Sequence, residues 1–170
     1  AASLEGLCLY YDMRMRFHAG ALACQIGLSA QPAPLWEENE WALLRARFLL
    51  WSASFQVALG ELEPGRQSRD AAGKLLGQLG DQNPDVRLPK AMYWQAEADD
   101  QSDLKIKLDY YQRSIALYHE LGDGWREAAM LIWAGEFAMR LGDSNLALQY
   151  MFEALRLSRQ AGEPNTLLHS

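Results

Sequence analysis

The stretch that decides the fold runs from Leu131 to Leu155 and reads LIWAGEFAMRLGDSNLALQYMFEAL. It contains two apolar-periodic segments rich in helix-forming residues, separated by Leu-Gly-Asp at 141–143. Glycine can adopt the left-handed turn that closes one helix, and aspartate can cap the helix that follows. The stretch therefore predicts two antiparallel helices joined by a short turn.

The same turn sequence recurs along the rest of the chain. Leu-Gly-Asp recurs at 79–81 and 121–123, and β-branched residues are few and scattered, which favours an all-α fold. The segment 81–88 is the loosest expected connection. We expect eight helices, paired into four antiparallel hairpins, at residues 2–13, 16–30, 36–59, 64–79, 88–100, 103–121, 125–141 and 144–161.

The hairpins repeat at a nearly constant spacing. Aligning Ser114 with Ala154 gives an offset of 40 residues, and two helices per period of this length are typical of a helical solenoid. We therefore expect a single repeat domain over 1–170, a right-handed superhelix of about four helix pairs. Its units cover about 1–32, 36–81, 88–122 and 124–162. Residues 166–170 read as the first turn of another helix, so we expect a fragment of a longer protein.

The spacing of small residues resembles the tetratricopeptide repeat family. That family places small residues at repeat positions 8, 20 and 27, and a turn glycine at position 15. In the best-matched unit these positions hold Gly135, Ala147, Ala154 and Gly142. The second unit has Ala53, Gly65, Ala72 and Gly60, and the first has Cys8, Gly20, Gly27 and Met15. The third unit departs most, with Gln95, Lys107, Ser114 and Ser102.

Two phrases are similar to the longer repeats of large bacterial ATP-dependent regulators, LuxR-type or nucleotide-cyclase-linked. These are ALYHELGDGW at 116–125, and GLCLYYD at 6–12 followed by Arg16-Phe17. The resemblance implies a cytoplasmic, non-enzymatic scaffold for signal transduction or transcription regulation. It would bind a protein, a peptide or a small effector. The alternative is a structural module that assembles by stacking on further repeats or on another copy.

In the family, five positions of each first helix line an inner groove. Arg47, Glu136 and Arg140 are expected to project there with their charged heads available to a partner. A groove without any ligand in this chain is the competing interpretation. Carried over, the groove candidates are Arg47, Leu50, Ser54, Val57, Met92, Ala96, Asp99, Ile132, Glu136, Met139 and Arg140.

No motif for catalysis or for a cofactor is found in the sequence. The formal charge is −6 without a basic block, which argues against a nucleic-acid or anionic-membrane surface. Neither a phosphate-binding loop nor a nucleophile–base pair is present, so we expect no enzyme activity and no cofactor. Cys8 and Cys24 fall at helix-packing positions, which favours buried thiols over redox chemistry. For Trp51, Trp94 and Trp133, core packing is favoured over a ligand cage.

One acidic cluster imitates the start of a calcium loop. It comprises Glu97, Asp99, Asp100 and Asp103, but Leu104 and Tyr110 stand where a calcium loop needs glycine and a bidentate glutamate. We therefore expect no metal, and Asp103 as the N-cap of the helix that follows.

Overall fold

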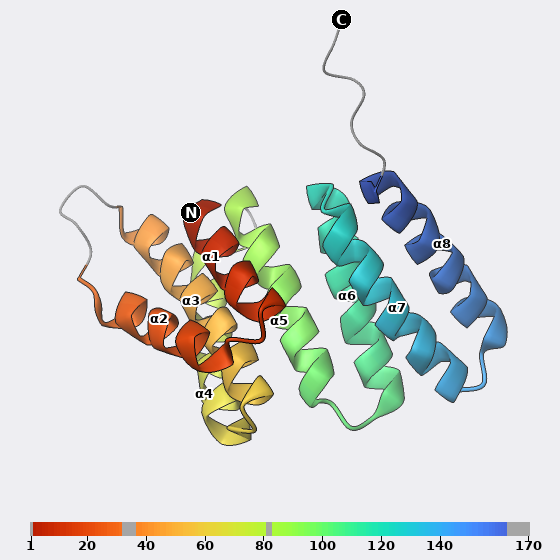
Figure 1. Cartoon of the computed structure of the whole chain (residues 1–170), viewed down its shortest axis with the longest axis horizontal. Helices are drawn as coiled ribbons and strands as arrows, with labels where there is room; N and C mark the ends of the chain where they lie inside the picture. Colours follow the sequence, from red (N-terminus) through yellow and green to blue (C-terminus); the bar gives the residue numbers. More distant parts are fainter. Residues whose placement is uncertain (1, 32–36, 81–82, 163–170) are drawn as a thin grey trace, which may run out of the picture. The chain divides into compact units, whose positions relative to one another are not determined.

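The computed structural model describes residues 2–31, 37–80 and 83–162, and within these ranges the chain is all-α, without a strand (Figure 1). The expected helix boundaries are confirmed to within two residues; a short 3₁₀ turn, Pro84–Val86, is an addition. The eight helices are α1 (Ala2–Met13), α2 (Phe17–Ser29), α3 (Glu38–Ala58), α4 (Leu62–Leu79), α5 (Arg87–Asp100), α6 (Leu104–Leu121), α7 (Gly124–Arg140) and α8 (Ser144–Gly162).

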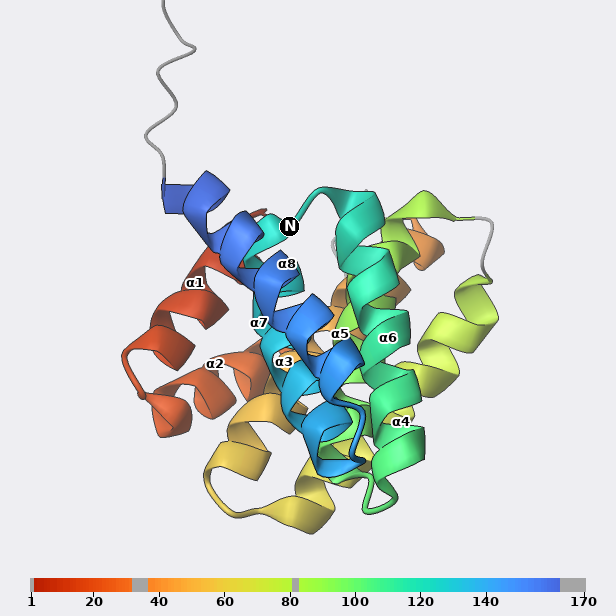
Figure 2. The same ribbon diagram turned by 90° about the vertical axis from the view of Figure 1, so that its right-hand side faces the viewer.

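The chain divides into two compact units, Ala1–Pro89 and Lys90–Ser170, with the boundary in the first turn of α5. In the first unit, α2 packs against α3 and α3 against α4. In the second, α6 packs against α7, and α8 lies over α7 (Figure 2). Within this unit, the hydroxyl of Ser114 on α6 also donates a hydrogen bond of 2.9 Å to the carbonyl oxygen of Ala91 on α5.

The Leu-Gly-Asp triplets end one helix and begin the next, as predicted. Gly122 and Gly142 have φ of 67° and 85°, the left-handed region in which a side chain would be strained. The carboxylate of Asp123 accepts a hydrogen bond from the amide of Arg126 at 3.1 Å, and Asp143 accepts one from Leu146 at 3.0 Å. For the first triplet, Gly80 also has a positive φ of 72°, while Asp81 lies outside the described residues.

Asp103 is the N-cap of α6, which confirms the interpretation chosen from the sequence. Its Oδ1 atom accepts hydrogen bonds from the amides of Lys105 at 2.8 Å and Ile106 at 3.3 Å. These two amides belong to the first turn of the helix and have no partner within it, so the carboxylate satisfies them.

Small residues lie where the helices of a hairpin cross. A Cβ on Gly65 would lie 2.9 Å from Cγ2 of Val57 and 3.3 Å from the carbonyl oxygen of Ala53. In the last hairpin the roles are exchanged between the helices, since the glycine, Gly135, is on the first helix and faces Ala147. Ala53, Ala72, Ala147 and Ala154 are all at most 3% exposed. A long side chain in place of one of these four alanines would push the helices apart.

The turn between α1 and α2 also contains a residue with positive φ, but this residue is not a glycine. Met15 has φ of 52° and occupies the place that Gly60 and Gly142 hold in later hairpins, where φ is 82° and 85°. A side chain in this region costs on the order of 1 kcal/mol relative to glycine.

The cysteines and the tryptophans of the chain differ in how far they are buried. Cys8 and Cys24 are both buried, as expected. Trp51 is buried and stacks on Phe55, with 5.7 Å between the ring centroids, and Trp94 stacks on Tyr110 at 5.3 Å. Trp133 differs from the expectation of core packing: it is 47% exposed, because it lies on a face of α7 that neither α6 nor α8 covers completely.

Candidate binding groove between α7 and α8

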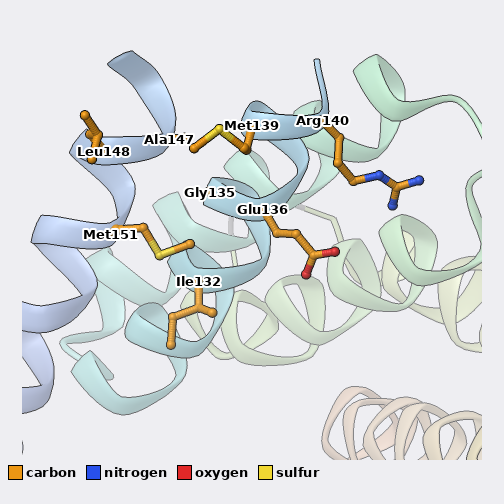
Figure 3. A pocket seen from close by; sticks show the side chains of 8 residues that line it. All are labelled: Ile132, Gly135, Glu136, Met139, Arg140, Ala147, Leu148 and Met151. Atoms are coloured by element: carbon orange, nitrogen blue, oxygen red, sulfur yellow. The ribbon is translucent and has the colours of Figure 1, made fainter. Parts of the chain in front are cut away.

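A hollow of about 380 Å³ opens between α7 and α8 (Figure 3). Four of the groove candidates from the sequence come together in it, all from α7. The hollow is lined by Ile132, Gly135, Glu136, Met139 and Arg140 of α7 and by Ala147, Leu148 and Met151 of α8.

The floor of the hollow is formed by the crossing of the two helices. A Cβ on Gly135 would lie 2.9 Å from Cε of Met151 and 3.4 Å from the carbonyl oxygen of Ala147. Since neither Gly135 nor Ala147 carries a long side chain, nothing from the crossing itself fills the space above it. The hollow is thus a consequence of the same small residues that bring the helices together.

The walls of the hollow are apolar and accessible. Ile132 and Met139 on α7 are 48% and 52% exposed, and Leu148 and Met151 on α8 are 52% and 40% exposed. Met139 and Met151 both extend into the space between the helices (Figure 3). Methionine is flexible and polarizable, and so it adapts to apolar partners of different shape.

One edge of the hollow is charged. Glu136 and Arg140 are exposed, lie one turn apart on α7 and project from the side away from α8 (Figure 3). An apolar hollow with a few polar groups at its border is the usual composition of a site for a peptide or a small ligand. The apolar walls would supply affinity, and the two charges would fix the direction in which a segment lies.

The apolar surface continues along α8 beyond the hollow. Leu148, Met151, Phe152 and Leu155 are 52%, 40%, 68% and 46% exposed and recur at the spacing of one helix face. Consideration of the first helices alone misses Leu148 and Met151. The signal was present in the sequence, because α8 carries two apolar rows, and only one is needed to pack against α7.

Three of the other candidates are buried. Arg47 is 9% exposed, Leu50 3% and Met92 9%, so the expectation that the head of Arg47 is available to a partner is wrong. α3 packs against α2 and against α4, and the long stem of an arginine is readily covered between helices. Ser54 and Val57 are exposed on α3, and Ala96 is half-buried.

Asp99 contributes to the contact between α5 and α6. Its Oδ1 atom accepts a hydrogen bond of 2.5 Å from the hydroxyl of Tyr111. The residue as a whole keeps an exposed surface, yet protein atoms crowd its carboxyl group, and this desolvation raises the pKa of Asp99. The hydrogen bond from Tyr111 and the charge of Lys107 oppose the rise. Burial and the nearby Asp99 carboxylate also raise the pKa of Tyr111.

A polar contact that the sequence did not reveal joins α6 to α7. Nδ1 of His119 lies 3.0 Å from Oε1 of Glu127, whose residue is only 5% exposed. Because the two residues sit on different helices, no local spacing rule could have paired them. The contact supplies a partner for a buried carboxylate.

Among the residues whose placement is described, no three His, Cys, Asp or Glu side chains form a group that could hold a metal ion. None of the described helices combines the length and the apolar character needed to span a bilayer. Comparisons of the chain with family models, with curated proteins and with solved structures found no match.

Proposed function

We propose that this chain is a non-enzymatic, tetratricopeptide-like repeat scaffold that binds an apolar helical segment of a protein partner between α7 and α8. The observation that carries the proposal is the hollow itself, with four half-exposed apolar side chains in its walls and Glu136 and Arg140 at one edge. Exposed apolar surface rimmed by polar groups is the common mark of an interaction site.

A helix is the ligand that suits this surface best. The groove lies along two neighbouring helices, and an amphipathic helix places an apolar side chain there at every turn. The methionines favour adaptable recognition over an exact fit to one small molecule. The cellular context that we propose is the cytoplasmic sensor or interaction segment of a bacterial signalling or transcriptional regulator, and it rests on the resemblance of the repeats.

A selection from a random-peptide display library against the immobilised chain tests this function. We expect enriched peptides to carry apolar residues three and four apart, and to bind at least tenfold more weakly to Leu148→Glu. The charge would be placed in an apolar wall, and a tenfold loss corresponds to about 1.4 kcal/mol. Gln149→Glu, which adds the same charge to the neighbouring exposed position, should bind as the wild type does.

Equal binding of the selected peptides to the wild type and to Leu148→Glu would exclude the groove as the binding site. Thermal unfolding followed by circular dichroism must show both variants to be folded, and we expect this because residue 148 is largely in solvent.

A further inference from the structure

Two internal interfaces of the chain follow one pattern. The second helix of a hairpin receives an aromatic side chain from the first helix of the next hairpin. In the first compact unit, a Cβ on Gly20 of α2 would lie 2.6 Å from the ring of Phe55 on α3. In the second unit, Phe137 of α7 stacks on Tyr111 of α6, with ring centroids 5.6 Å apart and an interplanar angle of 13°. Both phenylalanines lie two residues after the small residue at which their own hairpin crosses.

The same position in α1 carries Tyr10, two residues after Cys8. Phe55 and Phe137 are 0% and 6% exposed, whereas Tyr10 is 46% exposed. Leu7, one turn earlier, is 44% exposed, although the corresponding Ala134 of α7 is fully buried. α1 therefore presents to solvent the face that α3 and α7 bury against a preceding hairpin.

The opposite face is exposed on α8. Leu148 and Met151 are 52% and 40% exposed, and they occupy the positions that Leu108 and Tyr111 hold on α6. On α6, Leu108 and Tyr111 are only 8% and 2% exposed, because α7 packs on them. The groove of the last hairpin is thus the counterpart of a surface that the chain itself covers elsewhere with a first helix.

We propose that the groove between α7 and α8 receives α1 of a second copy of this chain, with Leu7 and Tyr10 packed on Leu148 and Met151. The inference rests on the proposed function and names the partner of the same site. The contact reproduces the packing of α7 on α6, in which an aromatic ring of a first helix fills the face of the second helix before it. At the edge of the groove, Glu136 carries the charge opposite to that of Arg14, which follows Tyr10 by one turn, while Arg140 borders the same edge.

The geometry of such a contact has a testable consequence. The two surfaces are different patches of one molecule, so the interface is heterologous, and a dimer keeps one free α1 face and one free groove. Association should therefore continue beyond dimers as the concentration rises, unless the rotation closes a ring.

Sedimentation velocity of the whole chain and of two complementary variants tests the inference. Tyr10→Glu disables the α1 face and leaves the groove intact, whereas Leu148→Glu disables the groove and leaves α1 intact. We expect the wild type to form dimers and larger species, and each variant alone to sediment as a monomer. An equimolar mixture of the two variants should form a 1:1 dimer and nothing larger, because only one competent pair of surfaces remains. Gln25→Glu and Gln149→Glu, exposed on α2 and α8, serve as controls and should associate as the wild type does.

Three results would overturn the inference. A wild type that stays monomeric at every concentration excludes the second copy, and peptide binding in the groove would then still support the proposed function. Monomers in the mixture of variants exclude the pairing of α1 with the groove. Association that Leu148→Glu abolishes but Tyr10→Glu leaves unchanged would show that a different surface enters the groove. Circular dichroism of each variant separates these outcomes from unfolding.

Discussion

The hairpins α3–α4 and α7–α8 share one backbone plan and differ in the surface they offer. Ala53, Gly60, Gly65 and Ala72 have the same spacing as Gly135, Gly142, Ala147 and Ala154, and in both sets the second member is a glycine with positive φ. Yet the positions that hold Met139, Leu148 and Met151 in the last hairpin hold Val57, Arg66 and Arg69 in the earlier one.

The difference shows that the crossing of two helices and the chemistry of the groove above it are set by separate residues. In the earlier hairpin the guanidinium groups lie near carboxylates, with Arg66 3.9 Å from Glu63 and Arg69 3.1 Å from Asp70. In the last hairpin the same places are apolar and lie half in solvent. A repeat can therefore keep its fold while one hairpin acquires a binding surface.

The largest expected effect comes from replacing groove residues of α7 and α8 with the residues that stand at the same positions of α3 and α4. The triple variant Met139→Val, Leu148→Arg and Met151→Arg should lose binding of the peptides selected on the wild type by about a hundredfold, because two charges replace the apolar walls. Fluorescence anisotropy with a labelled peptide measures the loss. The helical circular-dichroism spectrum should persist, since the same residue types are accommodated between α3 and α4. Unchanged affinity in the folded variant would remove the basis of the groove.

The shared backbone plan is tested by filling the second crossing of each hairpin. Ala72 and Ala154 are 0% and 3% exposed, so Ala72→Leu and Ala154→Leu should each lower the free energy of unfolding by about 1–3 kcal/mol through overpacking. Urea denaturation measures the change, with Gln78→Leu and Gln149→Leu as exposed controls on the same helices. A large effect in one hairpin and none in the other would mean that the two crossings are not equivalent.

A finer contrast concerns the glycine at each first crossing. On Gly65→Ala, the new methyl group meets Cγ2 of Val57, a short side chain with one preferred rotamer, and a carbonyl oxygen. On Gly135→Ala, it also approaches a carbonyl oxygen, that of Ala147 at 3.4 Å, but its shortest contact is the flexible end of Met151, which can move into the hollow. Alanine favours a helix over glycine by about 1 kcal/mol. We expect Gly65→Ala to destabilise by about 1 kcal/mol and Gly135→Ala to be neutral or stabilising in thermal unfolding; the reverse order would contradict the proposed freedom of Met151.

The smallest expected effect concerns pH and the second compact unit. Because its pKa is raised in the folded state, Asp99 binds its proton more tightly when folded, and its contribution to stability decreases as the pH rises above the unfolded value. Asparagine does not titrate, so Asp99→Asn removes this loss of stability at higher pH. Its side-chain oxygen can still accept the hydrogen bond from the hydroxyl of Tyr111. The stability of the variant relative to the wild type should thus improve between about pH 3 and pH 7 in urea titrations. A relative stability that falls over this range would reverse the assigned direction.

Much of the fold could be predicted from local signals. The Leu-Gly-Asp triplets mark where helices end and begin, because glycine and aspartate act through their own backbone and the next few amides. The crossings follow from the spacing of small residues, and Asp103 could be assigned as a cap because its neighbours do not complete a calcium loop.

The predictions that were wrong or incomplete concern residues whose surroundings depend on contacts between different helices. The burial of Arg47 follows from two helices that cover α3, and the exposure of Trp133 from the faces that α6 and α8 leave open. Half of the groove could be predicted, because the resemblance to tetratricopeptide repeats places Ile132, Glu136, Met139 and Arg140 on the groove side of a first helix. Leu148 and Met151 belong to the facing helix, and only the packing of α7 on α8 brings them opposite.

The most direct test of the groove uses the methionines as reporters. In a chain labelled at the methionine methyl groups, Met139 and Met151 lie in the groove, Met92 and Met130 are buried, and Met13 and Met15 are exposed at the end of α1. We predict that a peptide selected against the chain shifts the methyl resonances of Met139 and Met151 and leaves those of Met92 and Met130 in place. Shifts confined to Met13 and Met15, with the groove methionines unchanged, would contradict the account.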